Sequence, residues 1–91
     1  MKSFSGFEWD DNKRRANVAK HGLDFVDATE VFADPRQLTY RSLYRFGEER
    51  FVSIGSVHGK LIAVVFTQRG DKIRIISARP ARKNERAQYD R

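Results

Sequence analysis

The segment Leu61–Thr67 is a nearly continuous apolar run that is rich in valine and isoleucine. A strand of this composition is typical of the centre of a sheet whose two faces are both covered. Residues 69–71, Arg-Gly-Asp, are typical of a hairpin turn, and Lys72–Ala78 predicts the next strand. Alternation along that second strand predicts two faces, with Ile73, Ile75 and Ser77 on one and Arg74, Ile76 and Ala78 on the other.

Shorter strand signals flank this pair. Phe4–Trp9 alternates loosely and predicts a short strand or a packed N-terminal arm. Leu38 and Tyr40 predict the start of a short strand, and Phe51–Gly55 predicts another. Residues 56–60, which include a His-Gly pair, are typical of a loop.

A first helix is predicted over Asn12–Lys20. Asp10 or Asp11 can cap it, because a carboxylate accepts the free amide hydrogens of a first turn. Gly22 suits the left-handed position just past its end.

A second helix is predicted to begin at Asp24 and to end before Pro35, because the residue that precedes a proline avoids helical angles. Pro80 suits the first turn of a closing helix. The order of elements predicts one α+β domain over residues 1–91, with an N-terminal strand, two helices packed on an antiparallel sheet, and a C-terminal helix. The second helix carries an apolar stripe made of Phe25, Ala28, Val31 and Phe32.

The charge is placed unevenly along the 91 residues, which carry 18 Lys and Arg against 12 Asp and Glu. Residues 1–50 hold 9 basic and 9 acidic side chains, whereas residues 51–91 hold 9 basic and 3 acidic ones. Segment 24–34 reverses the trend, with four acidic residues and no basic one. A one-sided basic surface attracts polyanions, of which nucleic acid is the usual one for a small domain. The alternative is a solvated surface without a partner.

Several classes of site are not indicated. The chain has no cysteine, which excludes disulfides, thiol nucleophiles and iron–sulfur clusters. It shows no metal-ligand spacing, no phosphate-binding glycine loop and no serine nucleophile motif, so we expect no cofactor and no metal. No apolar run is long enough for a transmembrane helix, and we expect a cytoplasmic protein that does not contact a membrane.

The residues that remain suit the cleavage of RNA by attack of its own 2′-hydroxyl on the neighbouring phosphate. That reaction needs a proton acceptor, a proton donor and positive charge on the phosphorane, and it needs no metal. Each candidate also has a structural interpretation: His21 as a helix C-cap, Tyr89 as a packing residue, and Arg79 as a partner of Glu85 or Asp90 that holds the last helix.

A series of short motifs runs in order through nearly the whole chain. Its members are Phe7-Glu8-Trp9-Asp10, Lys13, Asn17, Lys20-His21-Gly22, Phe25, Ala28, Val31-Phe32, Asp34-Pro35, Glu49-Arg50, Gly55, Arg69, residues 74–79 (Arg-Ile-Ile-Ser-Ala-Arg), Ala81, Glu85-Arg86 and Tyr89. These residues resemble the signature of the BrnT toxin family. The resemblance implies a toxin of a type II toxin–antitoxin pair, with a RelE-like fold and a ribonuclease activity that blocks translation. It also implies a BrnA antitoxin, which binds the toxin and carries a DNA-binding domain, so that operator DNA is contacted only through the antitoxin.

We therefore expect a complex of toxin and antitoxin that forms a higher-order hetero-oligomer, with RNA as the toxin's substrate.

The resemblance to a RelE-like ribonuclease also implies a site of scattered basic residues and tyrosine on the sheet face and the last helix. Either His21 or Glu49 would accept the 2′-hydroxyl proton, and either Tyr89 or His21 would protonate the leaving oxygen. The expected phosphate-binding and charge-stabilising residues are Arg79, Arg82, Arg74 and Lys20, and further RNA contacts are expected at Arg69, Arg86 and Lys83.

Two other functions stay open at this point. The same basic surface could bind RNA or an acidic protein without cleaving anything. A DNA-binding regulator is the third interpretation, although the basic C-terminal third shows no helix-turn-helix pattern.

Overall fold

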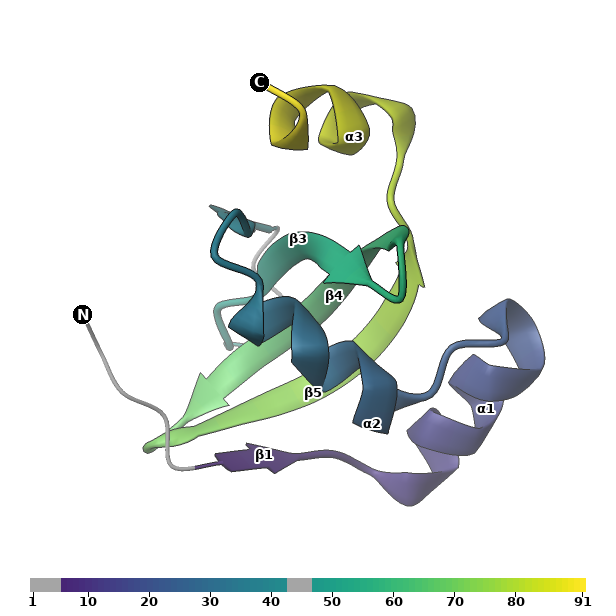
Figure 1. Cartoon of the computed structure of the whole chain (residues 1–91). Helices are drawn as coiled ribbons and strands as arrows, with labels where there is room; N and C mark the ends of the chain where they lie inside the picture. Colours follow the sequence, from purple (N-terminus) through teal and green to yellow (C-terminus); the bar gives the residue numbers. More distant parts are fainter. Residues whose placement is uncertain (1–5, 43–46) are drawn as a thin grey trace.

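The computed structural model describes residues 6–42 and 47–91. Within these ranges, a five-stranded mixed sheet is accompanied by three α-helices and one 3₁₀ helix, in the element order that the sequence predicts (Figure 1). The elements are β1 (Gly6–Glu8), α1 (Asp11–His21), α2 (Phe25–Ala28), the 3₁₀ helix η1 (Thr29–Ala33), β2 (Leu38–Arg41), β3 (Phe51–Val57), β4 (Lys60–Arg69), β5 (Lys72–Pro80) and α3 (Lys83–Tyr89).

The strand order is β1-β5-β4-β3-β2, so the apolar strand β4 lies at the centre, as its composition predicts. The expectation of a purely antiparallel sheet is wrong at one edge, because β1 pairs with β5 in parallel, with Phe7 opposite Ile73. Strands joined by a short turn must run antiparallel, but β1 and β5 are far apart in the chain and are free of that constraint. Residues 4 and 5 of the expected N-terminal strand lie outside the described residues.

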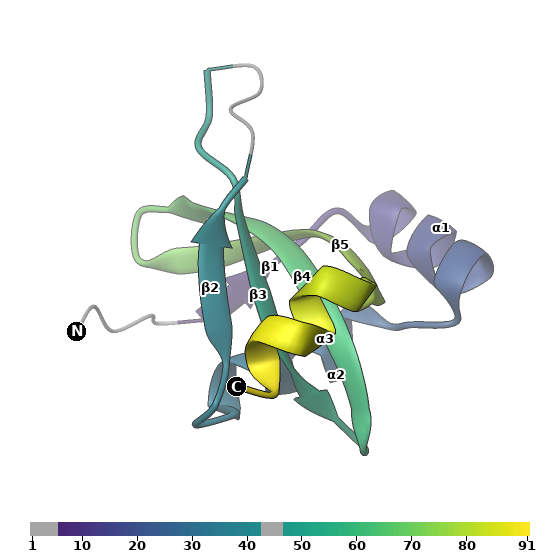
Figure 2. The ribbon, with the colours of Figure 1, turned by 90° about the horizontal axis from the view of Figure 1, so that it is seen from above.

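Both faces of the sheet are covered, by different helices. On one face, α2 and η1 supply Phe25, Ala28 and Val31 to the larger core. On the other face, α3 and the residue Ala81 before it cover β3 and β4 (Figure 2). Helix α1 covers neither face and lies beside β5, which corrects the expectation that it packs on the sheet.

The ends of the first two helices follow the sequence signals. Asp10 is the N-cap of α1, and one of its carboxylate oxygens accepts the backbone N–H groups of Asn12 and Lys13 at 2.8 and 3.1 Å. Gly22 ends this helix with a left-handed φ of 68°. Asp24 caps the second helix, which continues after one α-helical turn as η1 and stops before Asp34.

Two local predictions are wrong. The loop expected over residues 56–60 is a two-residue turn, because β3 reaches Val57 and pairs it with Lys60. His58 and Gly59 both have positive φ, 51° and 79°, as a tight hairpin turn of the primed type requires. Pro80 is the last residue of β5 and not part of α3.

The position of Pro80 has a simple physical reason. The backbone N–H of Ala78 points away from β4, since it donates to a side chain of α1. Two residues later, the nitrogen of Pro80 points the same way, towards the edge of β5. This edge pairs with β1 only at residues 72–74 and has no partner strand near Pro80. The missing N–H of proline therefore costs no ladder hydrogen bond.

A β-bulge divides β5 into two halves. Val65 pairs with Ser77 and Phe66 pairs with Ile75, so Ile76 is the extra residue. Beyond the bulge the alternation is shifted by one residue, and Ala78 joins Ile75 in the larger core. The predicted alternation is wrong here, because Ser77 lies on the face opposite to Ile75.

Candidate functional site

Five Lys and Arg side chains and His21 line a groove of about 560 Å³ on the face of the sheet that also carries α3. We call it the basic groove. It lies between α1 on one side and the start of α3 on the other, and its floor is formed by β4 and β5. The lining residues are Lys13, Ala16, Asn17, Lys20, His21, Ser42, Arg50, Val65, Ile76, Ser77, Arg79 and Arg82.

One face of α1 forms a wall of the groove, because Lys13, Asn17 and Lys20 are spaced by one and two helical turns. Asn17, 6% exposed, holds this wall in place. Its Nδ2 donates to the carbonyl of Leu23 at 2.8 Å, and its Oδ1 accepts the N–H of Ala78 at 3.0 Å. The second bond satisfies the edge of β5 where no strand pairs with it.

The bulge in β5 forms the floor. Since the alternation shifts at Ile76, the side chains of Ser77 and Arg79 project from the α3 side of the sheet and not into the larger core. If the alternation continued unbroken through residue 76, Arg79 would share the face of Ile73 and Ile75 and would lie in the larger core. Bulges are enriched next to functional sites, where they redirect side chains.

Arg79 is held by a buried carboxylate. Its Nη1 and Nη2 donate to the two carboxylate oxygens of Glu85 at 2.7 and 2.9 Å. Tyr40 donates its hydroxyl to the same carboxylate, and the backbone N–H of Arg82 donates to it at 2.7 Å. Glu85 is only 2% exposed. The pKa of the Glu85 carboxyl is lowered from 4.5 to about 2, mainly by the hydrogen bonds from the Arg79 guanidinium.

This cluster confirms that Arg79 pairs with Glu85 and holds the last helix. The hydrogen bonds from Arg79 to Glu85 raise the pKa of Arg79, so the pair stays charged. The side chain of Arg79 is 17% exposed and still lines the groove. Arg79 therefore has a structural contact with Glu85 and is also part of the candidate site.

The remaining basic side chains of the groove are not neutralised. Among the described residues, no carboxylate forms an ion pair with Lys13, Lys20, Arg50 or Arg82. The Nε of Arg50 is buried and has no hydrogen-bond partner among them. The groove is therefore a concave site whose charge is available to an anion.

Comparison with known proteins identifies the family of the chain. Residues 9–85 match the family model described as the ribonuclease toxin, BrnT, of a type II toxin–antitoxin system. The chain belongs to the BrnT toxin family. No curated protein matches the chain. A type II system pairs its toxin with a protein antitoxin, so membership of the BrnT family implies such a partner.

The basic groove of this BrnT-family chain brings together four of the six residues expected to be catalytic: Lys20, His21, Arg79 and Arg82. It does not include the other two. Glu49 pairs with Arg41 at 3.2 Å and lines a separate hollow near the β4–β5 turn. Tyr89 donates its hydroxyl to Asp34 at 2.6 Å, and this bond raises the pKa of Tyr89 and ties the end of α3 to the turn after η1.

The four residues expected to contact RNA lie outside the groove. Arg74 pairs with Glu8 at 2.9 Å, and Arg69 pairs with Glu48 at 3.2 Å. Arg86 lines a neighbouring hollow that shares His21 with the groove. Lys83 is exposed in the first turn of α3.

Lys13 and Arg50 were missed as site residues, although both are part of the BrnT resemblance. The spacing of Lys13 and Lys20 on one helical face was a sequence signal for the first. No local signal existed for Arg50, which reaches the groove from the start of β3 through the pairing of the sheet.

Among the residues that the structure describes, no helix combines the length and the apolar character needed to cross a membrane.

Proposed function

We propose that the basic groove binds a single RNA strand and cleaves it without a metal ion. The observation that carries this proposal is the lining of the groove, which contains Lys13, Lys20, Arg50, Arg79 and Arg82 and no carboxylate among the described residues. A divalent cation would be repelled by such a lining and would find no carboxylate ligand among the described residues that form it. A phosphodiester, by contrast, meets several donors of fixed positive charge.

The reaction is attack of a ribose 2′-oxygen on the adjacent phosphorus. A P–O bond to the 2′-oxygen forms, the bond to the 5′-oxygen of the next nucleotide breaks, and a 2′,3′-cyclic phosphate remains. His21 accepts the 2′-hydroxyl proton, and the leaving 5′-oxygen takes a proton from water. His21 lines the groove, whereas Glu49 and Tyr89 lie elsewhere, and this position favours His21 as the residue that transfers protons.

Lys20 and Arg82 stabilise the charge that develops on the phosphorane. They line opposite walls of the groove, one from α1 and one from the residue before α3, so a phosphate between them is contacted from both sides. A guanidinium keeps its charge at every physiological pH and can donate two hydrogen bonds to one phosphate. Arg79 contributes charge from the floor, where Glu85 fixes its orientation.

The cellular role that follows is inhibition of translation by a cytoplasmic toxin of RelE-like type. Its neutralising partner is a BrnA-like antitoxin, which forms a higher-order hetero-oligomer with the toxin and carries the contact with operator DNA. Membership of the BrnT family supports this role. Co-expression of the chain with the product of a neighbouring gene tests the pairing: we expect the two to elute as one complex, and a chain that elutes alone would contradict it.

The activity is tested with purified protein and a labelled RNA in the presence of EDTA. We expect cleavage that leaves 2′,3′-cyclic phosphate ends, and we expect His21→Ala to lose it while still binding the RNA. Cleavage that requires added Mg²⁺ would contradict the metal-free mechanism. If RNA is bound but stays intact, both alone and in a bacterial translation extract, the groove belongs to a binding module and not to a nuclease.

A further inference from the structure

The acidic segment 24–34 lies on the face of the sheet opposite to the basic groove, and the proposed function makes no use of it. Two of its four carboxylates have structural partners. Arg14 donates to both oxygens of Asp24 at 2.9 and 3.0 Å and lowers the pKa of that carboxyl. Asp34 accepts the hydroxyl of Tyr89 and two backbone N–H groups. Asp27 and Glu30 remain, and both are exposed.

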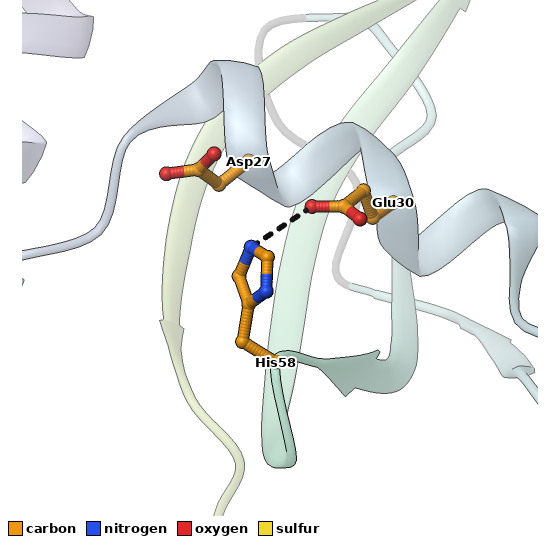
Figure 3. Close-up of side chains that lie close together, drawn as sticks. All are labelled: Asp27, Glu30 and His58. Carbon is orange, nitrogen blue, oxygen red and sulfur yellow. Dashed lines mark ion pairs between the residues drawn. The ribbon is translucent and has the colours of Figure 1, made fainter.

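These two carboxylates face a histidine from another element. Figure 3 shows Asp27 on α2, Glu30 on η1 and His58 in the β3–β4 turn, with His58 and Glu30 directed towards each other and the Asp27 carboxylate turned to one side. One ligand atom of each residue lies within 4.8 Å of the other two. His58 Nε2 and Glu30 Oε2 are 3.3 Å apart.

The separation between His58 and Glu30 fits two ligands of one metal ion, and the exposed Asp27 carboxylate, within 4.8 Å of both, would turn towards them to complete the site. Nitrogen and oxygen ligands lie about 2.0–2.1 Å from Zn²⁺, and in a tetrahedral site two such ligands are roughly 3.3 Å apart. The pair formed by His58 and Glu30 already has this separation. A hollow of about 180 Å³, lined by both Asp27 and His58, adjoins the cluster and leaves room for water as a further ligand.

The three residues are held by well-defined backbone. His58 occupies the first position of the two-residue turn, and the register of β3 and β4 fixes that turn. Gly55 of β3 lies so close to η1 that a Cβ there would be 2.9 Å from Cγ1 of Val31, which sets the distance between the turn and the acidic helix. The ligand residues therefore lie on the continuous α2–η1 segment and in the β3–β4 turn, and the core fixes the spacing between these two parts of the backbone.

We propose that Asp27, Glu30 and His58 bind one divalent transition-metal ion, with Zn²⁺ as the representative of its class. Imidazole selects such ions over Mg²⁺ and Ca²⁺, and two carboxylates balance the charge of a dication. The ion joins α2 and η1 to the β3–β4 turn and stabilises the folded chain by mass action. The proposal is independent of RNA cleavage, because the site shares no residue with the basic groove.

The test is a calorimetric titration of Zn²⁺ into the chain, without an affinity tag and after removal of metal with EDTA and dialysis. We expect one ion per chain and a rise in the melting temperature that EDTA reverses. His58→Asn removes the imidazole but tolerates the left-handed backbone of the turn, and we expect it to weaken binding by at least about tenfold. Glu30→Gln, which keeps the shape of the side chain, should also weaken it.

The matched control is His21→Asn, which removes the other histidine of the chain and should leave Zn²⁺ binding unchanged. The proposal is overturned if the unmodified chain does not bind Zn²⁺, in which case His58 and Glu30 form an ion pair only. It is also overturned if His58→Asn binds as tightly as the unmodified chain, or if Mg²⁺ and Ca²⁺ bind as well as Zn²⁺. None of these results bears on cleavage of RNA, which is measured separately.

Discussion

The region around the β4–β5 turn and the basic groove at the other end of these strands both carry basic residues, but the two regions differ in how those residues are paired. Near the turn, Arg69 pairs with Glu48 and Arg74 pairs with Glu8. At the opposite end, the basic groove keeps Lys20 and Arg82 without a carboxylate partner among the described residues. Net charge alone therefore does not locate an anion-binding site, because a paired arginine presents little field to a ligand. The position of an anion-binding site depends on which positive charges lie in a groove without a carboxylate partner.

Arg79 shares features of the paired arginines near the turn and of the unpaired residues of the groove. It lines the groove like the unpaired residues, yet its guanidinium is held by the buried Glu85. The contrast between paired and unpaired charges predicts that substitution of Arg79 affects folding first, whereas substitution of Arg82 affects the reaction alone. Four measurements test this contrast.

The largest effect is expected for Arg79→Ala. It leaves the carboxylate of Glu85 buried without its main partner, which typically costs about 3–5 kcal/mol in the free energy of unfolding. For a domain of this size each kcal/mol lowers the melting temperature by roughly 4–8 °C. Circular dichroism on heating measures the change. A variant that melts within about 4 °C of the unmodified chain would show that the pair does not hold α3.

The next effect is on catalysis. Arg82→Ala should lower the rate of RNA cleavage by about 10²–10³, since one donor to the transition state is lost, and should leave the melting temperature almost unchanged. Arg69→Ala is the matched control, because it removes an arginine whose charge Glu48 already balances. Equal losses of activity in the two variants would remove the distinction between paired and unpaired charge.

The third effect concerns acid stability. The pKa of Glu85 is lowered from 4.5 to about 2, so its ionised form stabilises the folded state above the unfolded pKa. This contribution is lost as the pH falls from about 4.5 to about 2 and amounts to about 3 kcal/mol. Urea unfolding of the unmodified chain and of Glu85→Gln across this range isolates it. We expect the difference between the two to shrink towards low pH, and a constant difference would contradict the assignment.

The smallest effect is on the salt dependence of RNA binding. Each phosphate contact on a single strand contributes about −0.7 to the slope of log K against log salt concentration, so four unpaired basic residues predict a slope of roughly −3. Arg82→Ala should make the slope shallower by one such contact, and Arg69→Ala should not. Fluorescence anisotropy with a short labelled RNA measures both, and identical slopes in the two variants would count against the groove as the RNA site.

Much of the local structure was predictable because its causes lie within a few residues. A carboxylate at Asp10 caps the amide groups that follow it, and Gly22 takes a left-handed angle that other residues avoid. The apolar run in β4 belongs at the centre of a sheet in any fold that buries it. The family resemblance carried the functional class, and the match over residues 9–85 confirms the family.

Other features depend on contacts between distant segments, and no local pattern encodes them. The bulge at Ile76 moves Ser77 and Arg79 to the groove face, and only the pairing of β5 with β4 reveals it. The same holds for Tyr40, whose bond to Glu85 joins β2 to α3, and for His58 of the β3–β4 turn, which pairs with Glu30 of η1. The sequence by itself determined the caps, the central strand, the surplus of basic residues and the family. The tertiary structure decided which of those charges are neutralised, because an ion pair forms only where the fold brings two side chains within reach.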